Sequence, residues 1–259
     1  MMKHQILSSY ITCAPMGDVV SEIITLAKNR KPAYVCFANV HMVVDAHTKK
    51  AFQDIVNAAH IASPDGKPVA VAMNLLYGAR QERVAGPEAM NEILKRANDK
   101  KLSVYFYGST DDVLTEIRNK LAQEYPHVVI AGMKSPPFRP ASPQEEKDDV
   151  EVIRQSGAQI VFVGLGCPKQ EQWMYRNYQQ LQAVLLGVGA AFPFFTGQLK
   201  RAPRWMQNSG LEWLYRIYAE PRRLFARYFV TNTLFLFFFA QQMLRQISEN
   251  FRKPNKPVI

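Results

Sequence analysis

The stretch Gln-Ile-Val-Phe-Val-Gly-Leu-Gly-Cys-Pro-Lys-Gln-Glu, residues 159–171, decides the fold. After Gln159 comes a short apolar run, Ile-Val-Phe-Val, that is typical of a buried strand, and Gly164 and Gly166 end this run. Pro168 is suited to the first position of a following helix. A strand, a glycine loop and a helix in direct succession predict one half of a βαβ crossover, and therefore a parallel sheet.

The same alternation of short apolar runs and amphipathic stretches continues through about the first 190 residues. We expect helices to begin at Asp18, Thr110 and Ser142, which are all N-cap residue types. The expected strands cover residues 6–12, 33–38, 102–107, 128–132, 159–163 and 183–187. The sequence thus predicts an α/β fold with a mainly parallel, Rossmann-like sheet and flanking helices, in which ligands bind beyond the carboxyl ends of the strands.

Two further glycine turns follow expected strands. Gly187-Val188-Gly189 again places two glycines at the end of a strand, as Gly164 and Gly166 do, and Gly108 ends the strand 102–107. The Gly108 turn is similar to half of a nucleotide-binding turn, although the full Gly-x-Gly-x-x-Gly fingerprint is absent. Loops from neighbouring strands can line one cleft and let the backbone approach a ligand, but close packing alone also demands glycines at such places.

Two polar segments are candidates for chemistry. Ser63-Pro64-Asp65-Gly66 follows a short apolar run and holds a carboxylate at a strand end, where Asp65 is available as a general base; the same sequence is also a common turn. In residues 80–88, Arg83 stands near Gly86 and a helix start at Pro87. A helix N-terminus beside arginine suits a diphosphate, whereas the alternative is a solvated loop.

Bulk properties exclude several classes of protein. The chain has 259 residues with 47% apolar and 21% charged content, which is ordinary for a globular protein. Three widely spaced cysteines favour neither a disulfide framework nor a metal knuckle, and the start of the chain lacks the features of a signal peptide, so we expect a cytoplasmic protein. There is no Walker A sequence, no Gly-x-Ser-x-Gly elbow and no Asp-x-Asp pair.

No metal site and no cofactor are expected. His41, Asp45 and His47 lie close in the sequence, but histidines six positions apart do not share a helix face. If the protein binds a diphosphate, cations and helix N-termini must therefore take the place of a metal ion.

The C-terminal part differs from the rest. From Lys200 onward there are 11 Lys or Arg against 3 Asp or Glu, which is +8 of the net charge of +10. A long helical pattern covers residues 221–249, and its apolar run 228–240 is too short and too polar to predict a membrane span. We expect a basic, aromatic helical appendage, residues 198–259, that lies on a membrane surface; packing on the body or on a second subunit is the alternative.

Together these motifs resemble the WecG/TagA/CpsF glycosyltransferases, also called glycosyltransferase family 26. The resemblance covers nearly the whole chain, in the same order. It rests on Asn39, the Pro64-Asp65-Gly66 turn, Glu82-Arg83-Val84-x-Gly86-Pro87, VGLGxPKQE, GVGAAF and the terminal RAPRW…GLEWLYR…EPRR…RY. It implies an α/β fold termed GT-E with a C-terminal appendage that completes the site and aids membrane attachment.

The resemblance also implies an activity. This is metal-independent, inverting transfer of a hexose or N-acetylhexosamine from a UDP-sugar, of the UDP-glucose or UDP-N-acetylmannosamine type, to an undecaprenyl-diphosphate-linked saccharide. The polymer would be an exopolysaccharide, capsule or cell-wall polymer, and the tail is more similar to exopolysaccharide members. The protein would be peripheral on the inner face of the plasma membrane, where both a monomer and a homo-oligomer are compatible with the resemblance.

Residue roles follow from the resemblance. Asp65 would be the general base and Arg83 would hold the donor diphosphate, while Asn39 and Gln170 would orient a sugar. Arg216, Arg223 and Arg227 would reach phosphates from the appendage. The expected backbone contacts to substrate are Gly66, Gly86, Gly108, Gly164, Gly166 and Gly189. Phe37 stands where many members have Thr and Pro193 where many have Asp, which hints at a changed sugar specificity.

Three rival interpretations remain. The arginines of the tail allow a nucleic-acid-binding module, but their long apolar run suits lipid better, so no nucleic-acid partner is expected. A nicotinamide oxidoreductase lacks its fingerprint here. A non-catalytic membrane scaffold would be separated from an enzyme by the absence of UDP release.

Overall fold

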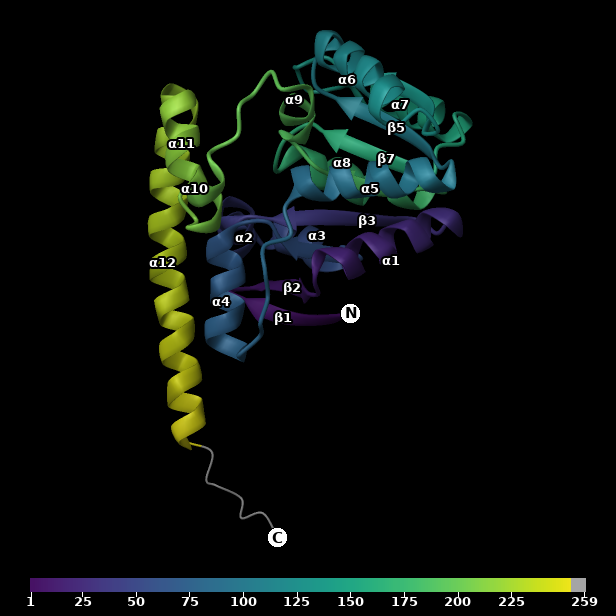
Figure 1. Ribbon diagram of the computed structural model, residues 1–259. Helices are drawn as coiled ribbons and strands as arrows, with labels where there is room; N and C mark the ends of the chain where they lie inside the picture. The colour runs from purple at the N-terminus through teal and green to yellow at the C-terminus, as the bar shows by residue number, and fades with distance from the viewer. Residues whose placement is uncertain (253–259) are drawn as a thin grey trace.

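The computed structural model is built around a six-stranded parallel sheet with helices on both faces (Figure 1). The structure describes residues 1–252, without the side chains of residues 208, 223 and 250–252. The strand order is β4-β3-β8-β7-β5-β6. The strands are β3 (Ala33–Ala38), β4 (Ile61–Pro64), β5 (Ser103–Gly108), β6 (Val129–Lys134), β7 (Ile160–Gly164) and β8 (Val184–Gly187). The expected α/β fold with a parallel sheet is confirmed.

Helices cover the sheet in two layers, each with its own apolar core. One layer holds α1 (Met16–Lys28), α5 (Gly86–Lys100), α6 (Asp111–Glu124) and α9 (Ala191–Thr196). The other holds α2 (Val40–Thr48), α3 (Lys50–Ala58), α4 (Lys67–Tyr77), α7 (Pro143–Gln155) and α8 (Lys169–Asn177), which a 3-10 turn, η1 (Tyr178–Gln180), follows. Helices on both faces explain why the strands are nearly continuous apolar runs.

Strand β3 shows how the sequence specifies this arrangement. All six of its residues are buried, and alternate side chains enter opposite cores. Val35 and Phe37 pack into the α1–α5 layer, whereas Tyr34 and Cys36 pack into the α2–α8 layer. A strand with this environment needs apolar residues at every position, which is why the range 33–38 was predictable to the residue.

Two expectations near the N-terminus are wrong. The single strand expected over 6–12 is a hairpin of β1 (Met2–Ile6) and β2 (Ser9–Cys13), separate from the main sheet. The chain reverses at Leu7, which has a left-handed φ of 54° without being glycine, so no turn residue marks the reversal. Helix α1 begins at Met16 after Pro15, so Asp18 lies inside its first turn rather than at the cap. Thr110 and Ser142 do cap α6 and α7 as expected.

The C-terminal helices run along one side of the body (Figure 1). They are α10 (Arg204–Asn208), α11 (Glu212–Ala219) and α12 (Pro221–Arg252). Helix α12 packs against α2 and α4, and Phe235 joins the core of the α2–α8 layer. Gln242 fixes its far half, because its side-chain amide donates to the carbonyl of Gln5 and accepts from the backbone N–H of Leu7.

The face of α12 that points away from the body is apolar and exposed. Phe225, Phe229, Leu236 and Phe237 are each more than half exposed. The segment Leu224–Glu249 is long and apolar enough to cross a membrane by length and composition, and 17% of its most apolar 18-residue window is buried. The apolar part of the helix is thus longer than the run 228–240 suggested, but one of its faces is occupied by the body.

Candidate functional site

One cavity of about 660 Å³ lies where the carboxyl ends of the strands meet the C-terminal helices. Strand β3 delivers Asn39 to it, β4 delivers Asp65, and the loops after β7 and β8 deliver Gly164 and Gly189. The far wall is formed by residues of α11 and α12. Parallel strands place their carboxyl ends at one edge, which brings these sequence-distant residues together.

Asp65 is held rigidly at the end of β4. Its backbone N–H donates to the carbonyl of Ala38 at 3.0 Å, and the preceding residue, Pro64, accepts from the N–H of Val84 at 2.8 Å. Burial raises the pKa of Asp65 to about 7, although the cations Arg83 and Arg216 oppose this effect. A fixed carboxyl group that titrates near neutral pH has the properties of a general base.

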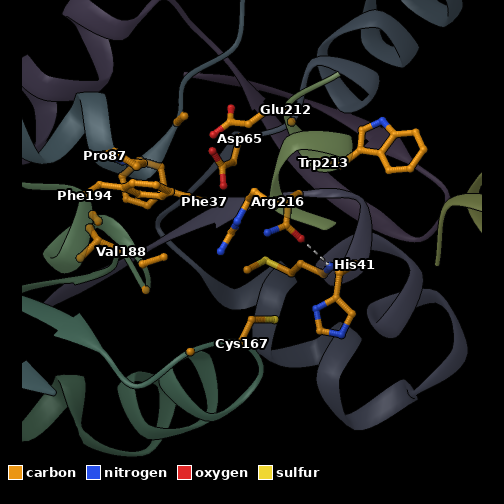
Figure 2. Close-up of a pocket in the computed structure, with 18 of the residues that line it drawn as sticks. Phe37, His41, Asp65, Pro87, Cys167, Val188, Phe194, Glu212, Trp213 and Arg216 are labelled. Carbon is orange, nitrogen blue, oxygen red and sulfur yellow. Dashed lines mark hydrogen bonds between the residues drawn. The ribbon is translucent and has the colours of Figure 1, made fainter. Parts of the chain in front are cut away.

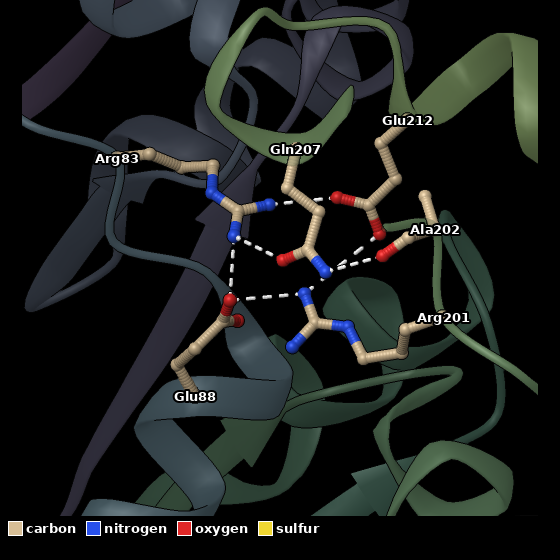
Figure 3. Close-up of polar contacts among 6 residues, drawn as sticks. All are labelled: Arg83, Glu88, Arg201, Ala202, Gln207 and Glu212. Carbon is tan, nitrogen blue, oxygen red and sulfur yellow. Dashed lines mark hydrogen bonds and ion pairs between the residues drawn. The ribbon is translucent and has the colours of Figure 1, made fainter. Parts of the chain in front are cut away.

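Arg83 lies beside Asp65, but in this structure carboxylates surround its guanidinium (Figure 3). It donates to Glu88 at 2.5 Å, to Glu212 at 2.7 Å and to Gln207 at 3.3 Å. Arg201 donates to the same Glu88 carboxylate oxygen at 2.9 Å. We call these five residues, Arg83, Glu88, Arg201, Gln207 and Glu212, the ion-pair cluster. Sequence reasoning found only Arg83, because no local pattern links residues 83 and 88 to residues beyond 200.

Two arginines of the C-terminal helices face the cavity differently. Arg216 and Arg227 form no ion pair within the described residues, and the Nε atom of each is buried without a hydrogen-bond partner there. Their guanidinium groups lie 5.7 Å from the ring of Phe194 and 5.5 Å from the ring of Tyr228. Cations without a carboxylate at a cavity wall are suited to bind an anion. The side chain of Arg223 lies outside the described part of the chain.

Gln170 has less freedom than the sequence suggested. Its Nε2 donates to Glu171 Oε1 at 2.7 Å and to the carbonyl of Gly187 at 2.8 Å, and its Oε1 accepts from the N–H of Gly166 at 3.1 Å. The amide therefore ties the β7 loop to the end of β8, leaving no amide proton for a sugar. Burial raises the pKa of Glu171 behind it to about 7.

Asn39 also has a structural bond. Its Oδ1 accepts from the backbone N–H of Met42 and so caps α2 at the cavity wall. This cap leaves the Nδ2 donor of Asn39 without a protein partner among the described residues. Asn39 therefore keeps a free donor for a substrate, unlike Gln170.

The glycines divide into two groups. Gly66, Gly164, Gly166 and Gly189 line the cavity. Gly86 and Gly108 do not: Gly86 lies under the Phe37 ring, and a Cβ atom on Gly108 would meet the backbone carbon of Gly164 at 2.6 Å. Close packing of the ends of β5 and β7 accounts for glycine at position 108.

Figure 2 shows that the cavity has two unlike sides. Phe37, Pro87, Val188 and Phe194 gather on one side and form what we call the apolar wall. His41 and Trp213 lie on the other side, and Arg216 lies between the two sides of the cavity. Pro193, the second position at which this chain departs from the expected pattern, also lines the cavity.

Within the described residues, no three His, Cys, Asp or Glu side chains gather as metal ligands. His41 pairs with Asp45 at 3.7 Å. His47 instead packs against the Phe238 ring, with the ring centroids 4.5 Å apart.

Comparison with known proteins places these features in one family. The profile of the glycosyl transferase WecG/TagA/CpsF family matches residues 4–249. An N-acetylglucosaminyldiphosphoundecaprenol N-acetyl-beta-D-mannosaminyltransferase of Bacillus subtilis (strain 168) is 33% identical over 193 residues, which are 74% of this chain and 73% of the relative. The enzyme of the same name from Bacillus spizizenii (strain ATCC 23059 / NRRL B-14472 / W23) is 30% identical over 201 residues, 77% of this chain and 76% of the relative.

Proposed function

We propose a reaction for this chain, which belongs to the WecG/TagA/CpsF family of glycosyl transferases. It transfers a hexose or N-acetylhexosamine from a UDP-sugar to an undecaprenyl-diphosphate-linked saccharide. The transfer inverts the configuration of the anomeric carbon. The two Bacillus relatives are named for transfer of N-acetylmannosamine to such an acceptor, which supports UDP-N-acetylmannosamine as the first donor to test and UDP-glucose as the second. The observation that carries the proposal is Asp65, fixed in a cavity that is also lined by Arg216 and Arg227, two cations without an ion-pair partner among the described residues.

Asp65 acts as the general base in this proposal. Its carboxylate takes the proton of the acceptor hydroxyl while that oxygen attacks the anomeric carbon, and the bond from that carbon to UDP breaks with its electron pair on the phosphate oxygen. Attack on the face opposite UDP inverts the anomeric centre. A pKa of about 7 leaves much of Asp65 ionised at neutral pH while keeping it basic enough to accept the proton.

Arginines stabilise the departing UDP. Charge grows on the diphosphate as the bond breaks, and fixed cations in a cavity offset it without a metal ion. Arg216 has no carboxylate partner in the described structure and meets this need directly. The guanidinium of Arg83 offsets this charge only when the diphosphate replaces Glu212 or Glu88 as its partner. Donor binding therefore exchanges one anion for another within the ion-pair cluster.

The open face of α12 supports attachment to the inner surface of the plasma membrane. Exposed phenylalanines follow the basic start of the helix, as in interfacial helices. The other face of α12 packs on α2 and α4 and forms hydrogen bonds with the N-terminal hairpin, an arrangement that favours a helix lying on the bilayer over one crossing it.

A vesicle assay tests the membrane proposal. Full-length protein is mixed with anionic phosphatidylglycerol vesicles, and the double variant Phe229→Ser, Phe237→Ser is compared with Val152→Ser, an exposed apolar residue of the body. We expect the double variant to bind about tenfold or more weakly, from the apolar area lost to the bilayer. Equal binding of all three proteins would contradict the proposal.

A turnover assay tests the activity. Purified protein is incubated with a panel of UDP-sugars and a short-chain prenyl-diphosphate N-acetylglucosamine acceptor, and both UDP release and product mass are measured. Acceptor-dependent UDP release with a product one sugar heavier is the expected result. Absence of such a product for every donor would reject the proposed acceptor.

A further inference from the structure

The cavity contains a titratable side chain that the proposed chemistry does not use. His41 lies in the first turn of α2, lines the cavity, and is 17% exposed. Its one polar contact within the described residues is the ion pair from Nε2 to Asp45, which leaves the second ring nitrogen, Nδ1, without a protein partner. Desolvation lowers the pKa of His41, and the charge of Arg227 lowers it further, so Arg227 lies within electrostatic reach.

Helix α12 brings Arg227 to this side of the cavity. The helix packs along α2, and Arg227, Tyr228 and Asn232 line the cavity together with His41. The Nε of Arg227 is buried without a partner in the described structure. The imidazole of α2 and the guanidinium of α12 thus line one cavity, and neither Nδ1 of His41 nor Nε of Arg227 has a hydrogen-bond partner in the described structure. Because Nε2 faces Asp45, Nδ1 of His41 becomes a hydrogen-bond donor when the imidazole is protonated.

Helices α11 and α12, which both contribute residues to the cavity, also carry exposed apolar side chains. Tyr218 of α11 is 86% exposed, and Phe225 and Phe229 of α12 are 58% and 65% exposed. Phe225 and Phe229 flank Arg227 in the sequence, and their rings stack on each other. In a prenyl-diphosphate acceptor the diphosphate joins the hydrocarbon chain to the saccharide, so it must bind where an apolar exit and the cavity meet.

We propose that His41 is an acceptor-binding residue, which together with Arg227 holds the diphosphate of the lipid-linked acceptor. This inference rests on the proposed function and gives the acceptor a direction: its prenyl chain leaves over α11 and α12, and its saccharide points past Arg216 to Asp65. The donor then lies toward the apolar wall, on the opposite side (Figure 2). Asp45 holds the imidazole from behind and favours its charged form when the diphosphate is bound.

Kinetics with two acceptors test the assignment. His41→Gln is expected to raise KM for the prenyl-diphosphate N-acetylglucosamine acceptor about tenfold, the usual effect of losing a hydrogen bond to a charged group. KM for the UDP-sugar stays unchanged, as does KM for an alkyl N-acetylglucosaminide that lacks the diphosphate. His47→Gln is the matched control, because His47 is on the same helix but packs on Phe238 outside the cavity.

A binding measurement separates this inference from the activity itself. Farnesyl diphosphate is titrated calorimetrically into the wild type, His41→Gln, His41→Arg and His47→Gln proteins. We expect about tenfold weaker binding for His41→Gln only, with recovery in His41→Arg because a cation is restored. Equal farnesyl diphosphate affinity in wild type and folded His41→Gln protein would overturn the assignment, even if sugar transfer is observed. Absence of any transfer would reject the proposed function while this titration still tests the site.

Discussion

Arg83 and Glu212 are 129 positions apart in the sequence, yet they form an ion pair 2.7 Å long that joins the body to α11. Both lie close enough to Asp65 to change its pKa: Arg83 lowers it and Glu212 raises it. The pair therefore connects the C-terminal helices to the chemistry in two ways. It fixes α11 at the cavity, and its charges tune the proposed base.

Glu212→Gln should move the acid limb of the kcat/KM profile to lower pH. The base must be ionised to act, and removal of a neighbouring negative charge lowers the pKa of Asp65 from its value of about 7. The pH dependence of kcat/KM measures the shift. Glu92→Gln, which removes an exposed carboxylate from α5, serves as control. An acid limb that stays in place would show that Asp65 does not govern it.

Asp65→Asn should abolish most transfer while leaving binding of UDP nearly intact. A general base commonly contributes about 10² to 10⁴-fold in rate, and the amide cannot accept the proton. Steady-state kcat and a UDP titration measure the two quantities. Asp54→Asn, at an exposed site on α3, is the control. If Asp65→Asn retained more than about half of the wild-type kcat, the role of base would belong to another residue.

The same Asp65→Asn protein should be more stable to heat than the wild type at pH 8. The folded pKa of Asp65, about 7, lies above the ordinary aspartate value of 3.8, so the folded state binds the proton more tightly, and stability falls as the pH rises between these values. Asparagine removes this loss. Thermal unfolding at pH 4 and pH 8 measures the difference in melting temperature between the two proteins. We expect the variant to melt at a higher temperature at pH 8, and the two proteins to melt at the same temperature at pH 4. An equal melting temperature for both proteins at pH 8 would contradict the burial of the charge.

Gly108→Ala should destabilise the fold strongly. The residue has a φ of +122°, and its new methyl group would lie 2.6 Å from the backbone carbon of Gly164, which cannot move as a side chain does. We expect a loss of about 2–5 kcal/mol from strain and overpacking together. Gly157→Ala is the matched control: it also has a positive φ, +64°, but nothing within 4 Å of the new atom. Chemical denaturation compares the two, and equal losses would mean that the contact with Gly164 is unimportant.

Transfer should persist after thorough treatment with EDTA. Within the described residues no cluster of His, Cys, Asp or Glu offers three metal ligands, while Arg216 and Arg227 supply unpaired positive charge. Initial rates before and after chelation, with Mg²⁺ or Mn²⁺ added back, measure the effect. A loss of rate that either cation restores would contradict the prediction.

The sequence predicted the sheet well where burial alone determines the residue types. Strand β3 was located to the residue because both of its faces are buried. The hairpin was missed because Leu7 occupies a left-handed turn position that sequence patterns assign to glycine or asparagine. The capping residues Thr110 and Ser142 were found because their signal is local.

The site was predictable in its position but not in its contacts. Strand ends after β3, β4, β7 and β8 indicated which loops meet, and Asn39, Asp65 and Gly189 do line one cavity. The contacts of Glu88, Arg201 and Gln207 with Arg83 and Glu212 could not be predicted, because an ion pair between distant segments depends on tertiary placement. Gln170 shows that a residue type alone does not predict a substrate contact. Its amide suggested sugar binding, but in the structure that amide forms hydrogen bonds within the protein.

The docking of α12 on α2 and on the N-terminal hairpin also has a consequence for synthesis of the chain. The apolar side of α2 leaves the ribosome early, but Phe235 and Gln242, which cover and fasten that region, are translated near the end. At about 5–20 residues per second this interval is roughly 10–40 s. During this interval the apolar residues of α2 that pack with Phe235 lack that cover, beside the loops of the candidate site. If the protein attaches to the membrane as proposed, the bilayer can cover that strip until α12 docks, and folding would then be coupled to membrane attachment.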